Sequence, residues 1–365
     1  MKKVILRILG GLIASALAVA GWWLLIDTRP PAKRPDLVRV PDSLGPPPAG
    51  YPTENALLAK FVLQELGLAN VDLIDVEGPI PVPEGVREET DIVYGMGGDT
   101  ELKLDLYSPK NLSGPVPGMI FIHGGGWSSG KRQDYKIYTT KFAEQGYVVA
   151  TVTYRLREAG YFPNCVEDVK CAVRWMRKHA KKLNVDPNRI AVIGGSAGGH
   201  LSMMVGYSSD VSTLEGTGGH EGVSSAVQAV IDLYGPADFS IPPERNHRLI
   251  TTFLQGRYED NIERYVAASP ITYVDPSDPP TLIFHGTVDT LVPVRQSDRL
   301  AEKFQELGMD YWYDRIDGWP HAMDVAQVVN DRVVKVVSAF LEETFAKPVV
   351  PVVPTALENM PDLSR

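Results

Sequence analysis

Cysteine is scarce in this chain, which holds only Cys165 and Cys171 among 365 residues. The two lie six positions apart in one predicted helix, and six helical residues rise about 9 Å, which is too far for a disulfide. Two cysteines also lack the spacing of ligands that is typical of a structural zinc site. We therefore expect two buried free thiols, which neither favour nor oppose export of the protein.

Basic residues are also fewer than acidic ones. The chain has 36 lysines and arginines and 45 aspartates and glutamates, which gives a net charge of −9. This balance argues against nucleic acid as a main partner. The glycine-rich stretches match neither G-x-G-x-x-G nor a phosphate-binding loop followed by Lys-Ser or Lys-Thr. No internal repeat is visible, and the length suits one large domain with additions.

The N-terminus differs from the rest of the chain, because residues 8–26 hold no charge at all. Three positive charges precede this run, at Lys2, Lys3 and Arg7. The pattern indicates a signal peptide, for which Ala18-Val19-Ala20 would serve as the cleavage site, or an uncleaved membrane anchor. A buried helix of a soluble domain is the alternative. We assign residues 1–27 to a signal peptide or anchor, and expect an exported protein that is periplasmic, secreted or attached to a membrane through residues 8–26.

Three further regions follow from composition. Residues 28–53 are rich in proline and predict an extended linker, and we expect deletion of residues 1–50 to leave a soluble, active domain. Residues 54–346 form the main domain, in which residues 54–78 are a candidate N-terminal cap built on a short amphipathic helix. Residues 347–365 repeat proline and valine and predict an irregular tail.

Within the main domain, apolar strand-like segments alternate with amphipathic helical segments. This alternation predicts an α/β fold with a mostly parallel sheet covered by helices on both faces. Ligands of such sheets bind at the carboxyl ends of the strands. The expected strands are 102–107, 118–122, 147–152, 190–193, 227–233, 281–284 and 311–316, and the expected helices are 164–182, one from 197 onward, 297–307 and 322–345.

The most unusual segment is Gly194-Gly195-Ser196-Ala197-Gly198, which follows a buried strand directly. It fits G-x-S-x-G, in which a serine occupies a strained turn between a strand and a helix. Small flanking residues let these elements approach closely and lift the hydroxyl off the sheet. The segment therefore predicts a nucleophile at Ser196, and a glycine-rich connecting loop is the alternative.

A second glycine-rich segment, His123-Gly124-Gly125-Gly126-Trp127, follows another strand. Its glycines leave backbone N–H groups unshielded, and acyl transfer needs such donors because its tetrahedral intermediate places negative charge on one oxygen. A flexible turn is the alternative reading.

A serine nucleophile needs a base, and the base needs an orienting acid. His321 lies between the last strand and the last helix, and is the candidate base. The six other histidines are better explained as loop-shaping, sheet-facing, solvated or irregularly placed residues: His123, His179, His200, His220, His247 and His285. Asp289 follows a buried strand and is the candidate acid, with Asp232 and Asp238 as alternatives. The chain order Ser196, Asp289, His321 is that of α/β-hydrolases.

Over residues 90–345 the chain resembles the α/β-hydrolase esterases, and most closely the group of bacterial feruloyl and acetyl-xylan esterases near the hormone-sensitive-lipase-like family. The segments that carry this resemblance are 123–127, 194–200, 268–274 and 285–289. The resemblance implies an α/β-hydrolase fold and an oxyanion hole formed by Gly125, Gly126 and Ala197. The chain departs from the group at Trp319 and Pro320, which we expect to narrow the pocket.

The resemblance further implies a serine carboxylic-ester hydrolase that acts through an acyl-enzyme on small-molecule esters, either short-chain or carbohydrate-linked. This chemistry needs no metal or cofactor. A serine peptidase of related fold is one alternative, although those enzymes usually carry a large extra domain. A non-catalytic binding protein on the same scaffold is the other, although such proteins lack the catalytic histidine that His321 supplies here.

Overall fold

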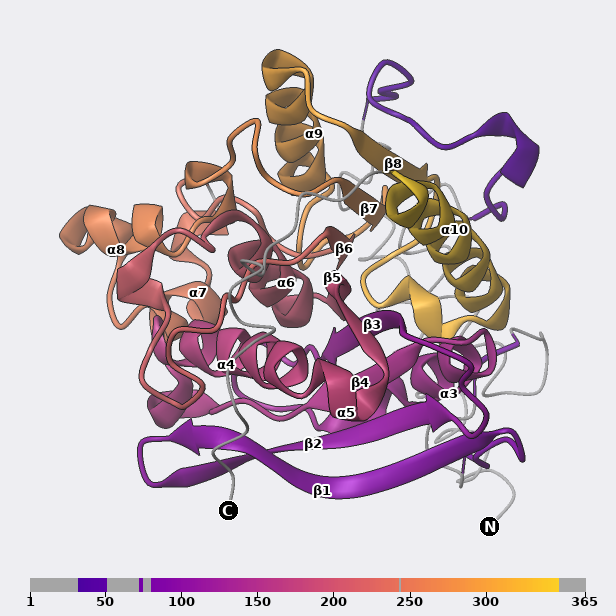
Figure 1. Cartoon of the computed structure of the whole chain (residues 1–365). Coiled ribbons are helices and arrows are strands. Elements are labelled where there is room, and N and C mark those ends of the chain that lie inside the picture. Colours follow the sequence, from indigo (N-terminus) through magenta and orange to yellow (C-terminus); the bar gives the residue numbers. More distant parts are fainter. Residues whose placement is uncertain (1–31, 51–71, 75–79, 243, 348–365) are drawn as a thin grey trace, which may run out of the picture.

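A computed structural model describes residues 32–50, 72–74, 80–242 and 244–347 (Figure 1). Its centre is an eight-stranded sheet of order β1-β2-β4-β3-β5-β6-β7-β8. The strands are β1 (Val86–Gly97), β2 (Thr100–Pro109), β3 (Val116–Ile122), β4 (Val148–Val152), β5 (Val185–Gly195), β6 (Ala229–Leu233), β7 (Thr281–Gly286) and β8 (Tyr311–Ile316). The neighbours from β4 to β8 run parallel, whereas β1 and β2 add an antiparallel edge. The predicted α/β class and mostly parallel sheet are confirmed.

Helices cover both faces of this sheet (Figure 1). The helices of the described residues are α3 (Lys136–Glu144), α4 (Asn164–Lys178), α5 (Ala180–Leu183), α6 (Ala197–Tyr207), α7 (Arg248–Phe253), α8 (Ile262–Ala267), α9 (Arg295–Leu307) and α10 (Gln327–Ala346). Along β3, Ile120 and Ile122 belong to the core under α4, α6 and α9, whereas Met119 and Phe121 belong to the core under α3 and α10. This alternation follows from the two-residue period of a strand, and it explains why the central strands read as unbroken apolar runs.

Cys165 and Cys171 are buried free thiols within α4, as predicted. The last helix begins later than expected, because the turn after His321 continues into a short 3-10 helix, Met323–Val325, before α10 starts at Gln327.

The proline-rich segment is where the structure departs from the sequence prediction. Residues 32–50 of the predicted linker lie against the outer edge of the sheet. Leu37 is fully buried in the core, and Arg39 exchanges backbone hydrogen bonds with Tyr313 of β8, at 3.1 and 3.2 Å. This part of the chain is therefore attached to the domain and is not a free spacer.

The domain holds the same segment through its carbonyl groups. Arg332 of α10 donates to the carbonyls of Leu44 and Gly45, at 2.7 and 3.0 Å, and the Trp319 indole donates to that of Pro48, at 3.2 Å. Proline lacks an N–H but keeps its carbonyl, so a proline-rich segment can still accept hydrogen bonds from side chains. Composition alone cannot distinguish such a segment from a linker.

This packing changes the expected result of truncation. Deleting residues 1–50 removes Leu37 from the core and leaves the buried donors of Arg332 and Trp319 without these acceptors. A buried leucine alone contributes about 2–5 kcal/mol. We expect the melting temperature to fall by roughly 5 °C or more, measured by thermal unfolding. Deletion of residues 1–31 is the matched control, because it keeps these contacts. Equal melting temperatures for the two truncations would contradict the packing.

Several sequence predictions fall outside the described residues. They are the signal peptide or anchor over residues 1–27, the greater part of the candidate cap over residues 54–78, and the tail from residue 348 onward. Within the described part of the chain, no helix has the length and apolar character needed to cross a membrane. The described part of the cap, residues 72–74, forms an antiparallel bridge from Leu73 to Ala326, close in sequence to His321.

Candidate active site

Ser196 occupies the turn between β5 and α6, at the carboxyl edge of the sheet. Its backbone has φ 56° and ψ −122°, a left-handed conformation that is uncommon outside glycine. The Ser196 N–H donates to the Leu233 carbonyl of β6, at 2.8 Å, and so anchors the turn. Backbone strain of this kind costs roughly 1–3 kcal/mol and persists only where the surroundings enforce it.

The glycines around Ser196 are required by close packing. A Cβ on Gly198 would lie 2.0 Å from the Ile122 carbonyl oxygen, and one on Gly194 would lie 2.5 Å from the same atom. This oxygen belongs to the backbone and is not the end of a flexible side chain, so it cannot move aside. The steric explanation of the G-x-S-x-G segment therefore holds, and the turn brings Ser196 close to the end of β3.

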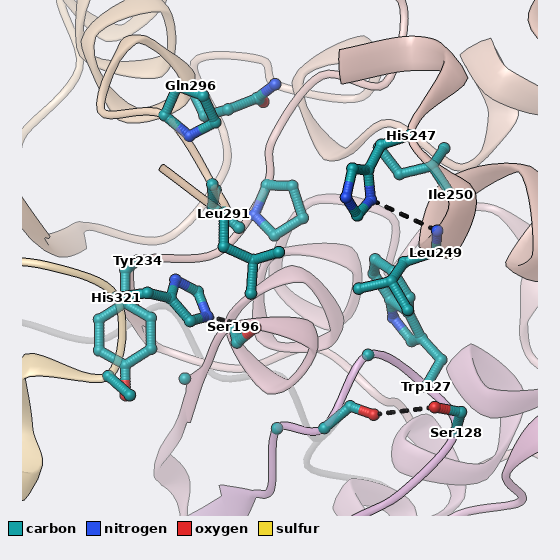
Figure 2. Close-up of a pocket in the computed structure, with 18 of the residues that line it drawn as sticks. Trp127, Ser128, Ser196, Tyr234, His247, Leu249, Ile250, Leu291, Gln296 and His321 are labelled. Atoms are coloured by element: carbon teal, nitrogen blue, oxygen red, sulfur yellow. Dashed lines mark hydrogen bonds between the residues drawn. The ribbon is translucent and has the colours of Figure 1, made fainter. Parts of the chain in front are cut away.

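Ser196, His321 and Asp289 form one chain of hydrogen bonds. His321 Nε2 lies 2.9 Å from Ser196 Oγ (Figure 2), and His321 Nδ1 lies 2.6 Å from Asp289 Oδ2. Asp289 follows β7 and His321 follows β8. Because β5, β7 and β8 are parallel, their carboxyl ends meet at one edge. The structure thus brings together all three residues that the sequence predicted.

The Asp289 carboxylate is held in its charged form. Its Oδ1 accepts the backbone N–H groups of Leu291 and Val292, at 2.9 and 2.8 Å, and its Oδ2 also lies 3.4 Å from His285 Nε2. Burial acts to raise the pKa of Asp289, but the hydrogen bonds from His285 and His321 outweigh it and lower the pKa to about 2. A permanent negative charge therefore faces His321 Nδ1 and favours the N–H on that nitrogen.

The alternative acids lie elsewhere. Asp232 is fully buried and accepts the Gly235 N–H at 2.8 Å, and burial raises its pKa well above the usual value. Asp238 pairs with Arg299 at 2.8 Å.

The histidine nearest to Ser196 in sequence, His200, turns away from it. His200 Nε2 lies 2.8 Å from the Ala268 carbonyl, and the Trp127 indole donates to its Nδ1 at 3.2 Å. Burial lowers the pKa of His200 to about 4, which keeps it neutral.

The second glycine-rich segment lies beside the serine. Gly125 and Gly126 have positive φ, 107° and 57°, and the Gly125 carbonyl accepts the N–H groups of Ser128 and Ser129. In the part of the chain that the structure describes, no hydrogen bond uses the N–H of Gly125, Gly126 or Ala197. Ala197 opens α6, where the first N–H groups have no partner within the helix. Unused donors beside a nucleophile are what an oxyanion hole requires.

These groups open onto a cavity of about 750 Å³ (Figure 2). Its walls are mainly apolar, with Leu291 on the side of His321 and Leu249 on the side of Trp127. Contrary to the sequence expectation, Trp319 and Pro320 are not among the residues that line it. The Trp319 side chain is 4% exposed and packs into the core under α10, beside residues 32–50.

Two functional neighbours were missed by sequence reasoning. The Tyr234 ring packs edge-on against His321, with centroids 4.9 Å apart, and its hydroxyl donates to Asp324. Asp324 also accepts from Tyr138 at 3.3 Å. Asp324 lies three residues after His321, so this network fixes the loop that carries the histidine. In the sequence, Asp324 is visible only as an acidic residue near the candidate base His321, and this by itself does not predict a role for it.

No group of three or more histidines, cysteines, aspartates or glutamates in the described residues could hold a metal ion.

This sheet order, with a serine turn after β5 and partners after β7 and β8, defines an α/β-hydrolase fold. The BD-FAE family profile matches residues 104–304, which is more than half of the chain, and the protein belongs to this family.

Comparison with known proteins extends this result. The chain is 32% identical to the esterase LipQ of Mycobacterium tuberculosis (strain ATCC 25618 / H37Rv) over 285 residues, covering 75% of this chain and 66% of LipQ. It is 30% identical over 268 residues to the probable carboxylic ester hydrolase LipM of the same organism, covering 70% of this chain and 61% of LipM. The chain thus spans slightly less than two thirds of these relatives. The resemblance to α/β-hydrolase esterases is confirmed.

Among solved structures, the chain is similar to a thermophilic esterase of Thermogutta terrifontis, Est2, in a butyrate-bound form. The two are 28% identical with a TM-score of 0.61, covering 71% of this chain and 94% of that one. Esterase 2 of the same organism, phosphoramylated by tabun, matches with 28% identity and a TM-score of 0.62, over 75% of this chain and 98% of that one.

Proposed function

We propose that this protein is a serine carboxylic-ester hydrolase that acts through an acyl-enzyme. The observation that carries the proposal is the hydrogen-bonded chain from Ser196 through His321 to Asp289, which opens onto a cavity beside unused backbone donors. Kinship with proteins named as esterases supports the same chemistry.

The geometry gives each group a role. His321 Nε2 takes the proton of Ser196 as its Oγ attacks the ester carbonyl carbon, and the charge that forms on the carbonyl oxygen is met by the N–H groups of Gly125, Gly126 and Ala197. His321 then gives the proton to the departing alcohol. Water enters, loses a proton to His321, and frees the acid by the same steps. Asp289 stabilises the imidazolium that forms in each half of the reaction.

We propose short-chain or carbohydrate-linked esters as substrates. The apolar walls of the cavity suit an acyl chain, and the proposal that this chain is short is supported by the solved relative from Thermogutta terrifontis, which was obtained with butyrate bound.

An ester panel tests this proposal. With 4-nitrophenyl esters of two to twelve carbons, we expect kcat/KM to be highest at two to six carbons and to fall beyond that. Acetylated and feruloylated sugars form the second arm of the panel. A maximum at ten or more carbons would contradict the short-chain assignment, and failure to hydrolyse any ester would contradict the proposed function itself.

We propose that the protein is exported, either by cleavage of residues 1–27 or with residues 8–26 retained as a membrane anchor. The basic start and the uncharged run support this. Cell fractionation and the intact mass of the purified protein test it. Recovery of the full-length chain in the soluble cytoplasmic fraction would contradict both forms.

A further inference from the structure

A second cavity, of about 770 Å³, adjoins the first. The two share Gly126, Trp127, Ser128 and Leu249 as lining residues. The partition between them is thus formed by Gly126–Ser128, which we call the oxyanion-hole loop, and by Leu249, which is 36% exposed at the start of α7. A substrate that extends from Ser196 into the second cavity would therefore have to pass Leu249.

The two cavities differ in charge. The residues that line the first cavity in the described part of the chain include no aspartate, glutamate, lysine or arginine. The second is lined by Arg157, Arg248 and Glu158, all of them exposed. Among the described lining residues, formal charge is therefore found in the wall of the second cavity, which holds two arginines and one glutamate.

Arg157 is built into this wall. Its φ of 57° is left-handed, and its N–H donates to the Trp127 carbonyl at 2.9 Å. Its Nε donates to the Ser128 carbonyl at 3.1 Å, so both ends of the residue are tied to the oxyanion-hole loop. A strained non-glycine residue held by its surroundings is a common feature of functional sites. This anchoring uses Nε and leaves both terminal nitrogens of the guanidinium available.

Arg248 is the first residue of α7. Among the side chains that the structure describes, neither Arg248 nor Arg157 forms an ion pair, and Glu158 forms none either. A carboxylate entering this cavity would therefore find two guanidinium groups not already neutralised by a described acid. Arginine suits this role, because its planar fork binds a carboxylate through two parallel hydrogen bonds.

We propose that the second cavity binds an anionic group, a carboxylate, on the part of the ester that extends past Leu249. The inference rests on the proposed esterase function and narrows its substrate class to esters that carry a negative charge beyond the scissile bond. The carboxylate can belong to the alcohol side or to the acyl side of the ester, and the experiment separates the two.

Matched pairs of esters test the proposal. For the alcohol side the pair is 4-acetoxybenzoate and 4-acetoxybenzamide. For the acyl side it is mono-4-nitrophenyl glutarate and 4-nitrophenyl pentanoate. The quantity measured is the anionic-to-neutral ratio of kcat/KM at low ionic strength. We expect the ratio, for one of the two pairs, to fall about fivefold in Arg248→Gln and to rise in Glu158→Gln.

The control is Arg87→Gln, which makes the same change of net charge on β1, where Arg87 is exposed and pairs with Glu89. The ratio should be unchanged in this variant. Arg248→Gln is the principal variant because its side chain makes no hydrogen bond to described residues, whereas Arg157→Gln also loosens the oxyanion-hole loop.

A ratio that stays the same in Arg248→Gln for both pairs, or that falls equally in Arg87→Gln, overturns the proposed anion site. In either case, continued hydrolysis of the neutral esters by the wild type leaves the esterase proposal standing. Failure of the wild type to hydrolyse any of the four compounds overturns the esterase proposal and the anion site with it.

Discussion

Ser196→Ala should lower kcat for 4-nitrophenyl acetate by about 10⁴-fold or more, because the serine, histidine and aspartate act as one unit. The removed oxygen is the one that lies 2.9 Å from His321 Nε2. Alanine keeps the same backbone demands at φ 56°, and a Cβ is already accommodated there, so the fold should be retained. The measurement is steady-state hydrolysis, with the uncatalysed rate subtracted.

Thermal unfolding supplies the control, because a melting temperature within about 2 °C of the wild type shows that lost activity is not lost structure. Hydrolysis within tenfold of the wild-type rate, in a folded variant, would show that Ser196 is not the nucleophile.

Asp289→Asn should lower kcat by roughly 10³- to 10⁴-fold while KM changes little. An asparagine can present its NH₂ to His321 Nδ1, which favours the tautomer with the proton on Nε2. Nε2 then cannot accept the proton of Ser196. The backbone N–H groups of Leu291 and Val292 still have an oxygen to donate to, so the loop should keep its shape.

Asp232→Asn and Asp238→Asn are the matched controls, since both change an aspartate at the end of β6 or just beyond it. We expect each to retain activity within about tenfold. If Asp232→Asn or Asp238→Asn were the damaging change and Asp289→Asn were mild, the acid would come from the region of β6 and this assignment would be wrong.

The pKa of Asp289 also predicts a pH dependence. Because its pKa is lowered from 3.8 to about 2, the native state binds this proton less readily than the unfolded chain does. The stability that Asp289 contributes is therefore fully present above the unfolded pKa and lost as the pH falls through about 2. Asp289→Asn should remove this contribution, so its free energy of unfolding should fall less steeply between pH 3.8 and about 2, and its acid unfolding should shift to a higher pH.

The catalytic residues could be predicted from the sequence because each of them lies shortly after the carboxyl end of a strand. A serine turn such as that of Ser196 has a fixed steric requirement for glycine, and parallel strands bring their carboxyl ends to one edge whatever lies between them. Asp289 and His321 could therefore be placed near Ser196, although Asp289 lies 93 residues after Ser196 and His321 a further 32 residues after Asp289.

What could not be predicted depends on contacts between distant segments. Residues 32–50 pack on the domain because side chains such as Arg332 donate hydrogen bonds to their carbonyl groups. The composition of a segment does not show which distant side chains will bind it. Trp319 turned out to face these residues and not the pocket. The bond from Tyr234 to Asp324 and the cavity beyond Leu249 likewise exist only once the sheet is assembled.

The central claim, that Ser196 is activated by His321 and Asp289, is tested most directly by covalent labelling. A fluorophosphonate reacts with an activated serine and not with an ordinary surface hydroxyl. After brief treatment at neutral pH, mass spectrometry of the intact chain and of its peptides should show one adduct, on Ser196, and this adduct should be lost in His321→Ala. A folded wild-type protein that takes up no label, or takes it up on another residue, would contradict the account.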